Sequence, residues 1–280
     1  MLGDLERMPN SGDIDFLMSH RHAQGGDFWA TIDGRTGVGS PFSTFDCGLM
    51  LTELGLPSSD PVARGIAEAL LQYATEDGRI RPGPKLAVQP CHTANAARLL
   101  ARLGYADDPR LARTFDHLLQ TQSEDGGWRC RVLKFGTGPD TDASNPGVTL
   151  AVLDALRFRK TLAATDAAKS AVGSLLEHWY IKRPLGPCRY GIGTLFMRVE
   201  YPMFRYNLFF YVYVLSFYHD ATDHPAFLEA FDALSSKLED NQLIVEHCRK
   251  GLESLELCRT GSVNPRATHR FREILRNLRR

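Results

Sequence analysis

An internal repeat limits what this chain can fold into. The segment from Phe45 to Arg81 and the segment from His92 to Arg129 follow the same order of signals: a helix-like stretch, Leu-Gly, a short link that contains Asp-Pro, a second helix-like stretch, and Asp-Gly. Repeats of about 40–50 residues are typical of helical hairpins, which cannot bury their apolar faces alone and therefore stack side by side. The sequence thus predicts an array of helical hairpins.

The residues at the ends of the expected helices support this prediction. Asp60-Pro61 and Asp108-Pro109 occupy corresponding places in the two units. Each pair puts a capping carboxylate directly before a proline at the first helical position, where the missing backbone N–H is tolerated. In both units a Leu-Gly pair stands where a glycine would end the preceding helix.

Further units extend the array. A degenerate third unit spans Val148–Arg183, a fourth spans Asn207–Glu246, and Gly25–Trp29 has the form of the end of another unit. Leu208–Tyr218 is apolar on nearly every side, which predicts an inner helix, whereas the second helices carry charged faces. No segment alternates with a period of two. We expect an all-α fold of about four to five hairpins, with first helices inside and second helices outside; an open solenoid is the alternative.

Composition excludes several classes of protein. The chain has 280 residues, with 33 basic and 33 acidic side chains, so net charge provides no general attraction to nucleic acid. Its longest apolar stretch, residues 208–218, is far shorter than the roughly 20 residues of a transmembrane helix, and its start lacks an apolar signal segment. Six scattered cysteines without a CxxC pair favour a reduced, cytoplasmic protein. We expect an N-terminal segment (1–24), a repeat domain (25–250) and a C-terminal basic amphipathic helix (251–280).

One short motif carries a family resemblance. Gln122, Gly126 and Trp128 form the pattern Gln-x-x-x-Gly-x-Trp, which is similar to the QW motif of the squalene–hopene cyclase and protein prenyltransferase superfamily. With the repeats, the chain resembles the α/α-toroid proteins of that group, and most of all small bacterial prenyltransferase or squalene-oxidase repeat proteins. The resemblance implies that the glutamine caps helix ends and that the tryptophan stacks on the next unit. It also implies an isoprenoid-processing enzyme, a terpene cyclase or prenyl-transfer enzyme, with its substrate in a hydrophobic cavity.

The resemblance directs attention to an acid pair. Class II terpene cyclases protonate an alkene with an Asp-x-Asp-Asp motif, and this chain has Asp140-Thr141-Asp142-Ala143, one aspartate short. Such an acid has to be kept neutral by burial or by a neighbouring like charge. Asp140 and Asp142 are therefore the candidate catalytic residues. The alternative is a solvated loop between repeats, which the glycine and proline residues around the pair favour.

Two cysteines are candidate metal ligands. Protein prenyltransferases bind zinc through Asp, Cys and His, and here Cys91 and Cys130 bracket the same hairpin. Cys188 or His92 would help to complete the four ligands that zinc prefers. The alternative is that these thiols are small buried apolar groups. No cofactor is expected, with zinc as the alternative.

Aromatic residues cluster ahead of and within the apolar helix. We predict that five of them line a ligand pocket: Tyr201, Phe204, Tyr206, Phe209 and Tyr213. Aromatic faces stabilise carbocations, and buried tyrosine hydroxyls need partners that a ligand-filled lumen would offer. The alternative is that these rings fill the core.

The arginine-rich C-terminus carries an apolar stripe that includes Phe271 and Ile274. The favoured interpretation is a docked helix with a solvated basic face; a diphosphate ligand or a peripheral membrane contact is the alternative. Three functions follow for the chain: an isoprenoid-processing enzyme, a non-enzymatic α/α-toroid binding or scaffolding module, and a zinc-dependent enzyme centred on Cys91 and Cys130. The expected partner is an apolar, isoprenoid-like small molecule and not nucleic acid.

Overall fold

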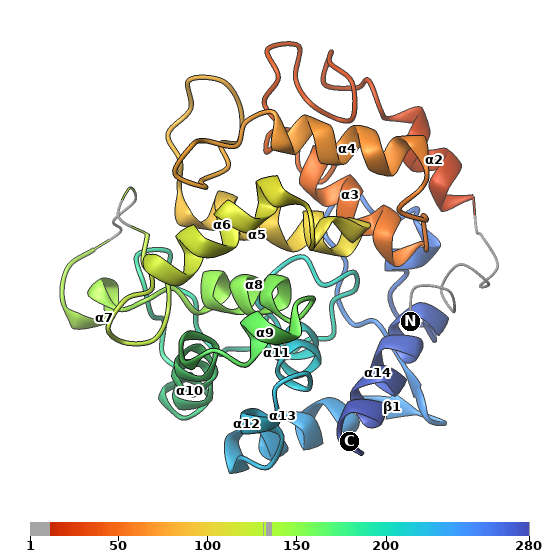
Figure 1. Cartoon of the computed structure of the whole chain (residues 1–280). Coiled ribbons are helices and arrows are strands. Elements are labelled where there is room, and N and C mark those ends of the chain that lie inside the picture. The colour runs from red at the N-terminus through yellow and green to blue at the C-terminus, as the bar shows by residue number, and fades with distance from the viewer. Residues whose placement is uncertain (1–11, 131, 133–135, 280) are drawn as a thin grey trace.

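The structure is a computed structural model that describes residues 12–130, 132 and 136–279. It is helical, and its longer helices form the predicted hairpins (Figure 1). The first helices of the units are α3 (Thr44–Glu53), α5 (Pro90–Leu100), α8 (Pro146–Leu156) and α11 (Leu208–Leu215). The second helices are α4 (Pro61–Leu71), α6 (Pro109–Gln120), α10 (Asp166–Ile181) and α13 (Pro225–Ser235).

The helices begin where the sequence signals place them. The Asp60 carboxylate accepts a hydrogen bond from the Val62 amide at 2.7 Å, and the Asp108 carboxylate accepts one from the Arg110 amide at 2.8 Å. Both prolines after these caps occupy the first helical turn. The predicted capping of the second helices is therefore confirmed.

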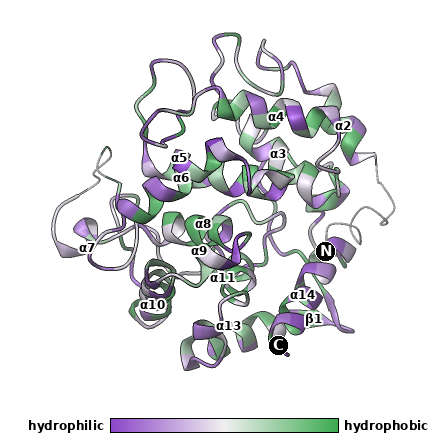
Figure 2. Ribbon diagram, viewed as in Figure 1, coloured by the Kyte–Doolittle hydropathy of each residue, from purple (hydrophilic) through white to green (hydrophobic). Residues whose placement is uncertain are grey.

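The first helices form the inner layer. Neighbours in the chain are neighbours in space, since α3 contacts α5, α5 contacts α8, and α8 contacts α11. Every residue of α11 is buried, as its apolar sequence predicts. Hydropathy follows the same division: α8 and α11 are mostly apolar, whereas α14 (Pro265–Asn277) is mostly hydrophilic (Figure 2). Among the described residues, no helix is long and apolar enough to cross a membrane.

Helix α14 connects the last inner helix with the first. It packs against α11, and Arg266 donates a hydrogen bond to the backbone carbonyl of Glu53, at the end of α3, at 2.9 Å. At the other end of the chain, the Asp13 carboxylate in α2 (Asp13–Ser19) accepts hydrogen bonds from the amides of Glu256 and Leu257. Both terminal segments thus contribute to the core that the repeats form.

The joints between units repeat with the sequence. Gly78 and Gly126 both have positive φ, and a Cβ on either would overlap a carbonyl oxygen of the next outer helix, that of Arg113 in α6 or Ser170 in α10. Only glycine allows this approach without strain. The equivalence of the two Asp-Gly turns, inferred from the sequence repeat, therefore corresponds to equivalent packing.

The QW-like motif forms the second of these joints. Gln122 donates hydrogen bonds to the carbonyls of Gly126 and Ala167, both at 2.7 Å, and so reaches α10 of the next unit. The buried Trp128 indole donates to the Leu118 carbonyl at 2.7 Å, near the end of α6 in its own unit. The hydrogen bond to the next outer helix therefore comes from Gln122, while the indole N–H caps the helix that precedes it.

The fourth unit ends differently from the first two. Its Glu-Asp-Asn segment forms a tight turn between β1 (Leu238–Glu239) and β2 (Gln242–Leu243), with positive φ at both Asp240 and Asn241. Asp and Asn tolerate this conformation better than most residues. This two-residue ladder is a local departure from the predicted helical fold. The short helical segments are α7 (Pro139–Asp142), α9 (Lys160–Ala163), α12 (His219–Thr222), the π-helical η1 (Ala101–Tyr105) and the 3₁₀ helix η2 (Glu256–Cys258).

Candidate ligand cavity

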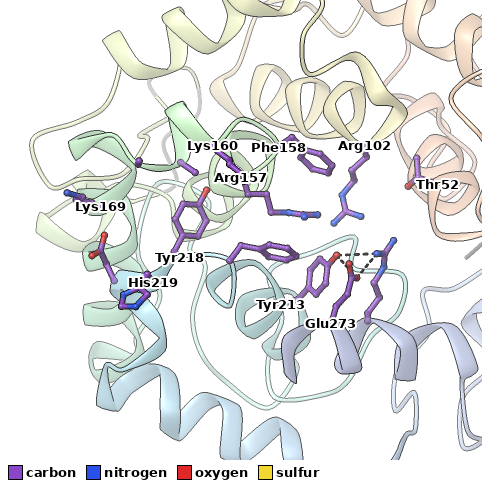
Figure 3. A pocket seen from close by; sticks show the side chains of 15 residues that line it. Thr52, Arg102, Arg157, Phe158, Lys160, Lys169, Tyr213, Tyr218, His219 and Glu273 are labelled. Atoms are coloured by element: carbon purple, nitrogen blue, oxygen red, sulfur yellow. Dashed lines mark hydrogen bonds and ion pairs between the residues drawn. The ribbon is translucent and has the colours of Figure 1, made fainter. Parts of the chain in front are cut away.

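A cavity of about 740 Å³ lies where the inner helices end (Figure 3). It is reached by residues at or just beyond the C-terminal ends of α3, α5, α8 and α11, and by two residues of α14. Its lining consists of Thr52, Arg102, Arg157, Phe158, Lys160, Ala163, Ala164, Lys169, Tyr213, Phe217, Tyr218, His219, Asp220, Arg270 and Glu273. Four aromatic rings and five arginine or lysine side chains thus share one hollow.

A buried carboxylate organises the inner side of the cavity. Asp154 in α8 is fully buried, and three arginines converge on it. Its Oδ2 accepts from Nε of Arg98 at 2.6 Å and from Nε of Arg102 at 2.9 Å, while its Oδ1 accepts from Nε of Arg157 at 2.6 Å. Burial alone would raise the pKa of Asp154, but the arginines hold that pKa well below its usual value. Asp154 is therefore ionised at neutral pH.

A second buried carboxylate, Glu53 at the end of α3, joins the cluster to α14. It accepts from Nη1 of Arg102 at 2.6 Å, from Nε of Arg270 at 2.7 Å and from the hydroxyl of Tyr201 at 2.7 Å. Burial opposes its ionisation, yet Arg270 and Arg102 lower the pKa of Glu53 to about 2. This carboxylate ties the first inner helix to the second and to the C-terminal helix.

A third carboxylate faces the cavity itself. Glu273 accepts from Nη1 of Arg270 at 2.7 Å and from the hydroxyl of Tyr213 at 3.1 Å, as Figure 3 shows. Burial acts against its charge, but Arg270 lowers its pKa. Burial also raises the pKa of Tyr213, so this pair presents an ionised carboxylate beside a protonated phenol.

The cluster holds more positive than negative charge. Arg98, Arg102, Arg157 and Arg270 face three carboxylates, those of Asp154, Glu53 and Glu273. Part of the excess positive charge is compensated by backbone carbonyls, because the C-terminal end of a helix carries roughly half a negative charge. One guanidinium also donates to a carbonyl: Nη2 of Arg98 bonds to Met203 at 2.5 Å.

Arg157 is the arginine that the cluster satisfies least. Its side chain is 9% exposed and uses Nε for Asp154, and the described part of the chain offers no hydrogen-bond partner to its two terminal nitrogens. The guanidinium lies 4.3 Å from the ring centre of Phe158 and 4.2 Å from that of Phe217. Figure 3 shows it pointing into the hollow from the end of α8. It is thus a cation held by aromatic faces, with donors directed into the cavity.

The rim of the cavity carries further charge. Lys160 and Lys169 are exposed at the side where α9 and α10 begin, with His219 and Asp220 opposite them on α12. The Lys169 amino group lies 3.8 Å from Asp166, and the other three side chains form no ion pair with any residue that the structure describes. An anion that enters from this side meets two lysines before it reaches Arg157.

The low pKa of Glu53 predicts acid sensitivity. A carboxylate whose folded pKa, about 2 here, lies below its ordinary value of 4.5 contributes stability that is complete above the ordinary value and is lost as pH falls toward the folded one. We expect unfolding free energy, measured by urea denaturation, to fall steeply through this window. In Glu53→Gln the slope should be shallower, and an unchanged slope would show that Glu53 is not ionised by its arginines.

The predicted acid pair lies elsewhere. Asp140 and Asp142 belong to α7, and neither lines the cavity. Their side chains are 46% and 44% exposed and pair with Arg183 and Arg129 respectively. An alkene-protonating acid needs a buried position next to its substrate, and neither residue has one. The structure therefore gives the catalytic assignment of these residues no support and agrees with a loop between repeats.

The candidate zinc ligands form a thiol cluster without an evident metal site. Burial raises the pKa of Cys91 to about 12, and the nearby thiols of Cys130 and Cys188 add to the effect. Zinc binds the thiolate. Within residues 12–130, 132 and 136–279, no group of three or more His, Cys, Asp or Glu side chains is arranged to hold a metal ion. The zinc hypothesis stays a prediction.

Of the five aromatic residues predicted to line a pocket, Tyr213 alone lines this cavity. Tyr201 is buried behind the cavity on Glu53, and Phe209 packs beside it with ring centres 6.1 Å apart. Tyr206 bonds to Nδ1 of the buried His178 at 2.8 Å, and Phe204 lies under the guanidinium of Arg249. Tyr201, Tyr206 and Phe209 are thus buried in the core, and Phe204 is partly buried against it.

The C-terminal helix packs against the core, as the sequence predicts, but some of its basic residues are buried and others are exposed. Phe271 and Ile274 are buried, and so are Arg266 and Arg270. Arg272 and its exposed neighbours keep a solvated basic face. The apolar stripe is therefore occupied by the core, which leaves only the basic face for a membrane contact.

Comparisons with known proteins leave the function open. No protein-family model and no curated protein sequence matches the chain. A solved type II terpene cyclase from Scytonema, in complex with geranylgeranyl dihydroxybenzoate, is 16% identical with a TM-score of 0.46, over 99% of this chain and 78% of that one. A polysaccharide lyase is 12% identical with a TM-score of 0.46, over 99% of this chain and 87% of that one. Neither likeness carries an argument about activity.

Proposed function

We propose that the hairpins form an α/α toroid that binds an isoprenoid-like ligand, apolar along its length and anionic at one end, in the cavity where the inner helices end. The observation that supports this most directly is Arg157. A largely buried guanidinium with unpaired donors is costly unless a partner arrives, and its aromatic slot lets an apolar group lie beside the cation.

The surroundings of Arg157 fit the same ligand. Phe158, Phe217 and Tyr218 offer apolar walls, and Lys160 and Lys169 place positive charge at the entrance. A cavity of about 740 Å³ lies within the range of small-molecule sites, about 300–1,000 Å³. An oligonucleotide or a protein surface does not fit a hollow of this size.

Removal of the Arg157 charge should weaken binding of an anionic ligand selectively. We expect Arg157→Met to reduce affinity for farnesyl diphosphate by roughly tenfold to a hundredfold, the effect of one hydrogen bond to a charged group. Affinity for farnesol, which keeps the chain but lacks the anion, should change far less. Isothermal titration calorimetry measures both.

A matched control separates this effect from general loss of positive charge. Arg64 is exposed on α4 and lies outside the cavity, so Arg64→Met should bind both compounds as the unaltered chain does. Equal losses for diphosphate and alcohol in Arg157→Met would contradict an anion site. Absence of binding by the unaltered chain would overturn the proposed function as a whole.

An isoprenoid-processing enzyme is the second candidate. It is favoured by the four rings on the cavity wall, because aromatic faces stabilise carbocations that form during cyclisation or prenyl transfer. Product analysis of the same farnesyl diphosphate incubations by mass spectrometry distinguishes the two. A new hydrocarbon, alcohol or prenylated product supports the enzyme, and recovery of intact diphosphate supports the binding module.

A further inference from the structure

A second hollow adjoins the cavity on the outside of α10. It measures about 390 Å³ and is lined by Lys169, Val172, Gly173, Leu176, Glu177, Tyr180, Asp220 and His224. Lys169 and Asp220 line both hollows. The groove thus begins at the cavity rim and continues between α10 and the start of α12 and α13.

The floor of the groove follows one face of α10. Val172, Leu176 and Tyr180 recur at four-residue spacing, which places them in a row along the helix. Tyr180 is 53% exposed and lies beside the ring of His224, with centres 6.4 Å apart. The groove therefore offers an apolar strip with one exposed aromatic ring at its far end.

Gly173 lines the groove beside this row, and nothing inside the chain packs where its side chain would be. A glycine within a helix is destabilising relative to alanine, because it loses more conformational freedom on folding. A Cβ on Gly48 of α3 would lie 2.7 Å from Leu99, and one on Gly147 of α8 would lie 2.8 Å from Tyr190. A Cβ on Gly65 of α4 would overlap Phe28. By contrast, a Cβ on Gly173 meets nothing within 4 Å.

We propose that the groove along α10 holds the distal apolar part of a long ligand whose anionic end occupies the cavity, and that Gly173 sets the clearance for it. This inference rests on the proposed function. It follows from the shared rim, which makes groove and cavity continuous, and from a helical glycine that leaves the groove open at a cost in helix stability. Gly173 is then a determinant of ligand length.

Filling the groove tests the inference. We expect Gly173→Leu to weaken binding of geranylgeranyl diphosphate by about tenfold, because the new side chain occupies the space of one or two methylene groups in the groove. Affinity for geranyl diphosphate, whose shorter chain stays within the cavity, should remain within about twofold. Both are measured by isothermal titration calorimetry on the full chain.

A control variant and a stability measurement separate a filled groove from a general loss of binding or folding. Gly193 also has open space where a Cβ would be and lines neither hollow, so Gly193→Leu should leave both affinities unchanged. The thermal midpoint of Gly173→Leu should not fall, since leucine favours the helix. Unchanged affinity for the long diphosphate, or an equal loss for both, overturns the groove. If the unaltered chain binds neither compound, the proposed function has failed before any variant is measured.

Discussion

Asp154→Asn is expected to lower the free energy of unfolding by about 3–5 kcal/mol, the usual result when one partner of a buried ion pair is removed. Asparagine keeps the size of the side chain but removes the charge that Arg98, Arg102 and Arg157 share. Three guanidinium groups then remain together in the interior with less compensation. Urea denaturation followed by circular dichroism measures the change.

The control for Asp154 is an aspartate that pairs on the surface. Asp107 is 94% exposed and lies 3.7 Å from Arg159, so Asp107→Asn should change stability by less than about 0.5 kcal/mol. A loss below about 1 kcal/mol for Asp154→Asn would contradict the central place of this carboxylate. It would mean that backbone carbonyls at the helix ends already balance the arginines.

The repeat explains why these charges meet. Glu53 precedes Leu54-Gly55 as Arg102 precedes Leu103-Gly104, so equivalent positions of adjacent units carry opposite charges and form an ion pair at 2.6 Å. Arg98 and Asp154 likewise lie at the same distance from the prolines that begin α5 and α8. In α8 the sequence contained a usable signal, because Asp154 is the single charged residue of a helix that is otherwise mostly apolar.

Local chemistry explains what could be predicted from the sequence. Caps, N1 prolines and the glycine turns at residues 78 and 126 depend on neighbours within a few residues, so pattern alone located the hairpins and their joints. The cavity depends on where separate helices end in space. Arg157 and Tyr218 come close only when α8 and α11 pack together. No spacing of residues in the sequence predicts that contact.

The candidate site shows the limit of motif reasoning. Asp140 and Asp142 match part of a cyclase motif, but they lie on a four-residue helix that begins at Pro139, and neither lines the cavity. Arg270 belongs to the arginine-rich C-terminal helix, for which the sequence predicts a solvated basic face, yet it is buried on Glu53 and Glu273. Sequence periodicity cannot tell a buried arginine from an exposed one when the partner carboxylate is contributed by another repeat.

Trp128→Ala is expected to lower the free energy of unfolding by about 3–5 kcal/mol, as for other large buried aromatic side chains. The indole is 1% exposed, and its N–H satisfies the Leu118 carbonyl near the end of α6. Truncation leaves a cavity and also an unpaired carbonyl at a helix end. Chemical denaturation gives the free energy, with Tyr180→Ala, at a 53% exposed position on α10, as the control that should change little.

Trp128→Phe separates the two contributions. Phenylalanine restores most of the buried ring but donates no hydrogen bond, so the remaining loss of about 1–3 kcal/mol measures the cap on the Leu118 carbonyl. The N-terminal unit offers an independent check, because the buried Trp29 indole donates to Leu17 near the end of α2 in the same manner, at 3.1 Å. If Trp128→Phe were neutral while Trp128→Ala cost several kcal/mol, packing alone would hold the joint. A comparable loss in Trp29→Phe and Trp128→Phe would instead show that an indole cap on the preceding helix is a repeated device of this fold.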